Sequence, residues 1–149
     1  MKILVLLDGS KWSYKAAINA IEIAKKKDAE ITIFSVIDRG ETRSAAFYFC
    51  RQSDRCDLVN EHEEKIYRDL KKSIGEDLNE LNLNMNRINL NGTSKVVEGK
   101  RDEEILKEYD AGGYTLVVMG AYGKRSNMRI GTLFKEISTA VNVPILVIR

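Results

Sequence analysis

The sequence contains few of the residues that build small, cross-linked or extended proteins. Its 149 residues include one proline, two cysteines and one histidine. Two cysteines are too few for a disulfide scaffold, and a chain of this length can bury a core without one. We therefore expect Cys50 and Cys56 to be reduced. One proline and ten glycines also exclude a collagen-like or low-complexity chain.

Neither sign of charge dominates the chain. It has 24 Lys and Arg against 22 Asp and Glu, a net charge of +2, with the signs interleaved. This balance predicts no binding to nucleic acid or membranes, since both require a basic face. Apolar runs such as residues 3–7 and 116–119 are far shorter than the roughly 18 residues that cross a bilayer. The N-terminal run is also too short for a signal peptide, so we expect a cytoplasmic protein.

The spacing of apolar residues alternates between two periods along the chain. Continuous or alternating apolar runs predict strands at residues 2–7, 30–37, 114–119 and 144–148. Helical spacing predicts helices at residues 13–27, 60–81, 102–109 and 132–141. Between them, residues 83–98 predict one more strand, folded as two short pieces around a tight turn at Asn91-Gly92.

This alternation of strands and helices predicts the fold class. We expect one α/β domain over residues 1–149, with a five-stranded, mostly parallel sheet, doubly wound by helices on both faces. Residues 38–60 show no clear period, and we expect a long loop or a partly helical insertion at about residues 39–60. In such sheets ligands bind beyond the carboxyl ends of the strands.

Two segments with suitable chemistry follow predicted strands. Asp8-Gly9-Ser10 follows the first strand, and the segment from Gly120 to Thr132 follows the fourth. The second segment contains glycines, two early cations and a helix start, which are the ingredients of a phosphate site. The alternative is structural: the glycines form a turn, Thr132 caps its helix, Asp8 is a turn former or cap, and the cations are solvated.

Three segments resemble the universal stress protein family. Asp8-Gly9-Ser10, followed by Ser13 and an alanine-rich helix, is similar to the family's opening segment. Residues 97–106 resemble its middle, and residues 116–149 resemble its close. The resemblance implies a Rossmann-like fold of the adenine nucleotide alpha-hydrolase type, the architecture that the periodicity predicts independently. It also implies a homodimer, for which the terminal strand at residues 143–149 offers an edge.

The resemblance further implies a nucleotide site. Family members that bind ATP share a Gly-x2-Gly-x9-Gly-Ser/Thr pattern, whereas here seven residues separate the second glycine from the third. Carried over by position, Asp8 would lie beside the ribose and any bound metal, and the Val36 backbone would meet the adenine edge. The residues that would surround the phosphates are Gly120, Gly123, Gly131 and Thr132. A shorter loop offers fewer backbone amides to phosphate, and the cations Lys124 and Arg125 can compensate for them.

We therefore expect a stress-response or signalling module that binds ATP, with or without Mg²⁺, and lacks rapid catalysis. The first alternative is a family member without nucleotide that acts as a protein-interaction dimer. Its partner surface would be the apolar patch at residues 45–49, unless that patch packs on the core. An enzyme acting on adenine nucleotides is a further alternative. No Walker-type motif is present, so for the binding module we expect at most slow ATP hydrolysis.

Other chemistry has little support in the sequence. Cys50, Cys56 and His62 lack the paired spacing of zinc ligands, so we expect no metal site there. A Cys50–Cys56 redox pair is the alternative, but no CxxC motif is present, and we treat the thiols as incidental. His62 is the only histidine, and it lies in a highly charged helix start typical of a solvated face. We therefore assign no catalytic residue.

Overall fold

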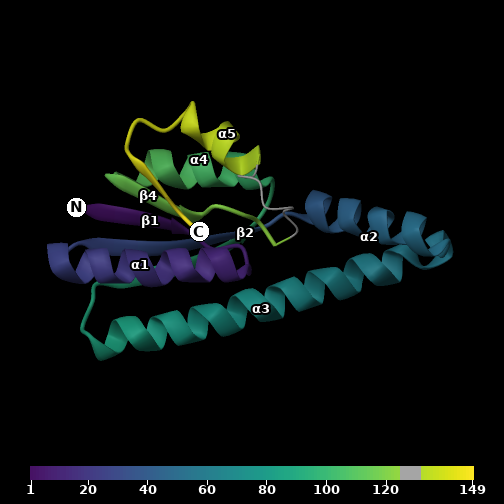
Figure 1. The fold of residues 1–149 in the computed structure, drawn as a ribbon, viewed down its shortest axis with the longest axis horizontal. Helices are drawn as coiled ribbons and strands as arrows, with labels where there is room; N and C mark the ends of the chain where they lie inside the picture. Colours follow the sequence, from purple (N-terminus) through teal and green to yellow (C-terminus); the bar gives the residue numbers. More distant parts are fainter. Residues whose placement is uncertain (125–131) are drawn as a thin grey trace.

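The computed structural model describes residues 1–124 and 132–149, which contain a single five-stranded sheet (Figure 1). The strand order is β3-β2-β1-β4-β5, and every neighbouring pair is parallel. This arrangement confirms the predicted parallel sheet. The strands are β1 (Lys2–Leu6), β2 (Glu30–Ile37), β3 (Gly92–Glu98), β4 (Leu116–Gly120) and β5 (Ile145–Ile148).

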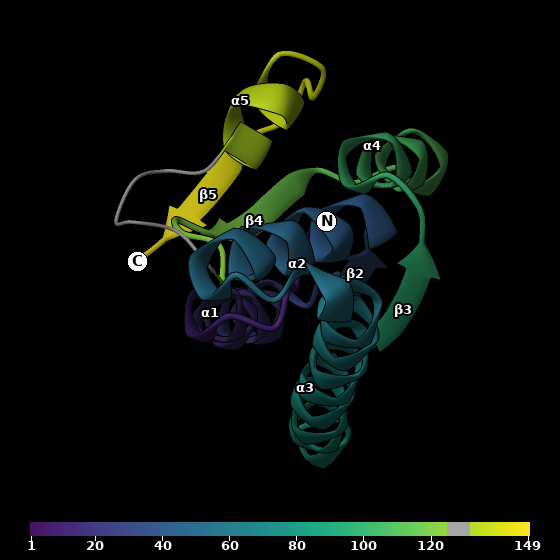
Figure 2. The same cartoon turned by 90° about the vertical axis from the view of Figure 1, so that its right-hand side faces the viewer.

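Helices cover both faces of the sheet, as predicted (Figure 2). On one face lie α1 (Lys11–Lys27) and α3 (Val59–Arg87), and on the other lie α4 (Arg101–Gly112) and α5 (Thr132–Ser138). The last of these ends three residues before the predicted boundary at residue 141. Within the described residues, no helix is both long and apolar enough to cross a membrane.

The central strand β1 shows why the apolar runs are continuous. Ile3 and Val5 pack with α1 and α3, whereas Leu4 and Leu6 pack with α4 and α5. All four side chains are buried. Because successive side chains of a strand point to opposite faces, a strand covered on both sides needs an apolar residue at every position.

The segment predicted as an insertion is mostly helical. It consists of α2 (Arg39–Ser53), a short 3-10 helix η1 (Cys56–Leu58) and the start of α3. Asp38 begins α2, because its Oδ1 accepts hydrogen bonds from the N–H groups of Gly40 (2.8 Å) and Glu41 (3.3 Å). Together, α2 and the N-terminal half of α3 form a helical hairpin that extends past the sheet (Figure 1).

The expectation of two reduced cysteines is wrong for this structure. Cys50 and Cys56 form a disulfide, with Cα atoms 4.5 Å apart. The pairing follows from the turn after α2, where Asp54 adopts a left-handed conformation (φ 55°) and reverses the chain. The turn that brings the two sulfur atoms together forms only when α2 and α3 pack as a hairpin. The spacing of six residues between Cys50 and Cys56 therefore did not predict the disulfide.

The predicted two-piece strand at residues 83–98 is also partly wrong. Helix α3 continues to Arg87, because Leu81 and Met85 extend its buried stripe against the sheet. Asn91-Gly92 is not a hairpin turn; Gly92 opens β3, which runs parallel to β2. A Cβ at Gly92 would meet the flexible end of the Met85 side chain and lie 3.1 Å from Ile31 Cγ2, so the glycine allows close packing there and does not form a turn.

Candidate functional site

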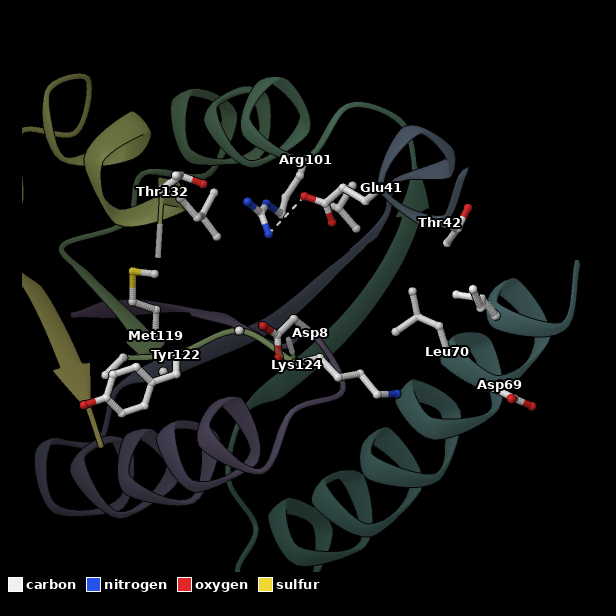
Figure 3. A pocket seen from close by; sticks show the side chains of 16 residues that line it. Asp8, Glu41, Thr42, Asp69, Leu70, Arg101, Met119, Tyr122, Lys124 and Thr132 are labelled. Atoms are coloured by element: carbon white, nitrogen blue, oxygen red, sulfur yellow. Dashed lines mark ion pairs between the residues drawn. The ribbon is translucent and has the colours of Figure 1, made fainter. Parts of the chain in front are cut away.

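A cavity of about 510 Å³ lies at the carboxyl ends of the strands (Figure 3). It opens beside β1 and β4, where the strand order reverses direction. Such a switch point is where ligands bind in open α/β sheets. Six of the eight predicted site residues line the cavity: Asp8, Val36, Gly120, Gly123, Lys124 and Thr132. The other two, Arg125 and Gly131, lie outside the described residues.

Asp8 is held in place by the turn between β1 and α1. Its Oδ1 accepts a hydrogen bond from the N–H of Ser10 (2.9 Å), and its own N–H donates to Ser13 Oγ (3.1 Å). The turn depends on Gly9, whose φ is +84°. The structural role expected as an alternative is therefore real. This turn uses only the Oδ1 atom of the Asp8 carboxylate. The Oδ2 atom lies toward Gly123, 3.8 Å from the position that a Cβ on Gly123 would have.

The two described glycines of the second loop have different roles. A Cβ on Gly120 would lie 2.8 Å from the backbone N of Ser13 and 2.8 Å from the carbonyl carbon of Trp12. Gly120 therefore allows β4 to pack against the start of α1, which is a structural role. Among the described residues, a Cβ on Gly123 would meet only Asp8 Oδ2 within 4 Å. Gly123 thus leaves open space in the cavity beside that carboxylate.

Sequence reasoning missed an ion pair at the cavity. Arg101, in the first turn of α4, pairs with Glu41 of α2, with Nη1 and Oε1 3.1 Å apart. Partial burial raises the pKa of the Glu41 carboxyl above its usual value, and Arg101 opposes this effect. Arg101 follows β3 closely, so the strand-end rule could have pointed to it. Glu41 lies in the segment without a clear period, and no sequence signal indicated it.

The remaining lining divides into apolar and polar parts. Val36, Met119 and Leu133 provide apolar surface, while Asp8, Asp69 and Lys124 provide charge. This combination suits a ligand with a flat apolar part, hydroxyl groups and an anionic part. Within residues 1–124 and 132–149, no group of three or more His, Cys, Asp or Glu side chains is placed to hold a metal ion.

The fold and this cavity define a class: doubly wound α/β proteins with a ligand site at the switch point of the sheet. The sequence profile of the Universal stress protein family matches residues 1–149, which is the whole chain. The chain belongs to the universal stress protein family. The resemblance in the opening, middle and closing segments is thereby confirmed.

Individual relatives agree with this assignment. The chain is 23% identical to the stress response protein NhaX of Bacillus subtilis (strain 168), over 99% of this chain and 97% of the relative. The universal stress protein UspA from Lactobacillus plantarum has the same fold, with a TM-score of 0.76 at 17% identity, covering 100% of this chain and 97% of that one. The universal stress protein from Archaeoglobus fulgidus, solved in complex with dAMP, has a TM-score of 0.61 at 14% identity, covering 100% and 98%.

Proposed function

We propose that this protein binds an adenine nucleotide, with ATP as the first candidate, and acts as a stress-response or signalling module without rapid turnover. The observation that carries the proposal is the convergence of Asp8, Val36, Gly123 and Lys124 on one cavity from separate parts of the chain. Family membership and the relative that was solved with dAMP support the ligand class.

Each of these residues would contact a different part of the nucleotide. The Oδ2 of Asp8, which accepts no hydrogen bond from the residues that the structure describes, can accept hydrogen bonds from ribose hydroxyls. Val36 and Met119 offer apolar surface to the base. Gly123 leaves room for a phosphate to approach the backbone, and the Lys124 ammonium can pair with that phosphate. If Mg²⁺ accompanies ATP, Asp8, whose Oδ2 lies 3.8 Å from the position of a Cβ on Gly123, would offer a carboxylate oxygen, and the phosphates would supply further oxygen ligands.

Rapid hydrolysis of a nucleotide needs a general base, which is most often a histidine. The only histidine, His62, is not among the residues that line the cavity, so a general base there would have to be a carboxylate such as Asp8 or Asp69. Steady-state hydrolysis above about 1 per second, in the ordinary range of enzymes, would contradict this part of the proposal.

A calorimetric titration tests the binding proposal. Nucleotide-stripped protein is titrated with Mg-ATP, together with the variants Gly123→Val and Gly75→Val. The first variant places a branched side chain beside Asp8; the second places the same side chain on α3, where a Cβ meets no atom within 4 Å. We expect micromolar binding by the wild type and by Gly75→Val, and at least a tenfold loss in Gly123→Val. No heat up to millimolar ATP for the wild type would refute the proposal.

We also propose a homodimer that forms through residues 143–149. Strand β5 is one edge of the described sheet. The carbonyls of Pro144 and Ile148 accept hydrogen bonds from the N–H groups of Val117 and Ala121, so strand alternation directs the backbone of Val147 outward. A Val147→Pro substitution would remove an outward N–H without breaking the pairing to β4. We expect the wild type to sediment as a dimer and this variant as a monomer; a monomeric wild type at tens of micromolar would contradict the proposal.

A second candidate function is a protein-interaction dimer that binds no nucleotide. The observation that favours it is the patch at residues 45–49: Ala45 and Ala46 are buried, but Phe47, Tyr48 and Phe49 are 43%, 63% and 51% exposed. Three adjacent exposed aromatic residues are unusual on a surface without a partner. This candidate predicts a silent ATP titration and a partner whose binding is weakened by Tyr48→Ser.

A cytoplasmic location also remains a proposal. Thiols in the cytoplasm are usually kept reduced, whereas Cys50 and Cys56 form a disulfide in this structure. The redox state of the two cysteines in cells therefore bears on the location. Rapid alkylation of intact cells, followed by mass analysis of the protein, would report the redox state, and cell fractionation would report the location.

A further inference from the structure

Arg101 is positioned by a carboxylate that joins two helices. Its backbone N–H donates to Asp38 Oδ2 (3.1 Å), while Asp38 Oδ1 accepts from the N–H of Gly40 at the start of α2. One side chain therefore ties the first turn of α2 to the first turn of α4. This connection places Glu41 and Arg101, which are 60 positions apart in sequence, on the same side of the cavity.

The guanidinium of Arg101 has more hydrogen-bonding capacity than its surroundings use. The side chain is 25% exposed and points toward the cavity interior (Figure 3). Among the described residues, its polar contact is the ion pair with Glu41, and its buried Nε has no partner. An arginine carries five N–H donors, and leaving a buried donor unpaired is unfavourable. The cavity thus holds a guanidinium whose buried Nε–H has no hydrogen-bond partner among the described residues.

The sheet order indicates which part of a nucleotide Arg101 would meet. The loop with Gly123 and Lys124 follows β4, Asp8 follows β1, Val36 is in β2, and Arg101 follows β3. Since the strands lie in the order β3-β2-β1-β4, the chain leaves the sheet at these residues in the reverse order; the Lys124 side chain then extends toward α3, while Arg101 reaches in from α4 (Figure 3). In Figure 3, Arg101 and Lys124 lie on opposite sides of Asp8. If the phosphates lie beside Lys124 and the ribose beside Asp8, as proposed above, the base would extend toward Arg101 and Glu41.

We propose that Arg101 and Glu41 select the base of the nucleotide by its 6-amino group. This inference rests on the proposed function and deepens it. The guanidinium donates to a ring nitrogen of the purine, and the Glu41 carboxylate accepts from the exocyclic amino group. With the guanidinium at N1 and the carboxylate at the 6-position, a 6-oxopurine would present its N1–H donor to the guanidinium and its O6 acceptor to the carboxylate, so both contacts would be unfavourable. Adenine is thereby preferred over hypoxanthine.

Two ligand series test this inference by calorimetry. The first compares adenosine, AMP and ATP on the wild type, Arg101→Met and Lys124→Met. Because Arg101 acts at the base, its replacement is expected to lower the affinity for all three ligands by the same factor, about tenfold. Because Lys124 acts at the phosphates, its replacement is expected to leave adenosine unchanged and to cause a loss that grows with phosphate number. The side chain of Arg101 is not the group that bonds Asp38, so the fold should persist; thermal melting checks this.

The second series compares adenosine with inosine on the wild type and Glu41→Gln. We expect the wild type to prefer adenosine at least tenfold. The glutamine amide can donate as well as accept. The ratio of adenosine affinity to inosine affinity should therefore fall toward one in Glu41→Gln. Charge loss alone would change both affinities together and leave their ratio unchanged.

The outcomes separate this inference from the proposed function. An Arg101→Met loss that grows with phosphate number, or a wild type that binds inosine as tightly as adenosine, overturns the base-reading role while nucleotide binding stands. A wild type that binds none of the ligands overturns both. Equal loss across the three adenine ligands, with a reduced base preference in Glu41→Gln, supports the inference.

Discussion

Gly120→Ala is the substitution whose effect can be worked most directly from the structure. The added Cβ would lie 2.8 Å from Ser13 N, 2.8 Å from Trp12 C and 2.9 Å from Trp12 Cβ. Real Cβ atoms essentially never approach other heavy atoms this closely, and backbone atoms cannot rotate away. The end of β4 or the start of α1 must therefore shift. Overpacking of this kind costs about 1–3 kcal/mol of unfolding free energy.

Urea unfolding and thermal melting measure this effect, and Gly123→Ala is the matched control. For a domain of this size, each kcal/mol lowers Tm by about 2–4 °C. The control adds the same methyl group three residues later, where the nearest atom of the described residues, Asp8 Oδ2, is 3.8 Å away in ordinary contact. Its stability should stay within about 0.5 kcal/mol of the wild type. Equal stability of the two variants would refute the assignment of Gly120 to helix packing and Gly123 to the cavity.

Three further changes have defined outcomes. Tyr114→Phe removes the hydrogen bond from the phenol to Glu108 Oε1 (2.6 Å) and should cost about 1.5–3 kcal/mol at neutral pH. Burial and, after it, that bond raise the pKa of the Tyr114 phenol from 10.0 to about 12. The protonated phenol therefore stabilises the fold fully below pH 10, and this stabilisation is lost as the pH rises toward 12. The difference in unfolding free energy between wild type and variant, measured by urea unfolding, should narrow over that range. Gly75→Ala, in open space on α3, should raise stability by about 0.5–1 kcal/mol, and a loss in thermal melting would contradict it. Reduction of the Cys50–Cys56 disulfide should lower the unfolding free energy by about 2 kcal/mol, since it closes a short loop; unchanged urea curves with dithiothreitol would show that the bond does not stabilise the fold.

The sequence predicted the elements whose signal is local. Strand β2 has the predicted bounds, because its β-branched run is buried at nearly every position. Helix α1 agrees within two residues at its start, since Ala17, Ile21 and Ala24 mark a buried stripe. The site residues next to the strand ends, such as Asp8 and Gly123, could be found because a parallel sheet brings all its carboxyl ends to one edge.

Tertiary contacts decided the rest. Helix α2 buries Thr42, Ala45, Ala46 and Cys50, and such small residues leave a weak periodic signal. The extension of α3 depends on Met85 packing against the sheet, which overrides the strand-like pattern after residue 82. The cavity's ion pair exists because Asp38 joins α2 to α4. Periodicity records which face of each element is apolar, whereas the partner of a polar side chain depends on distances that arise only when separate elements pack together.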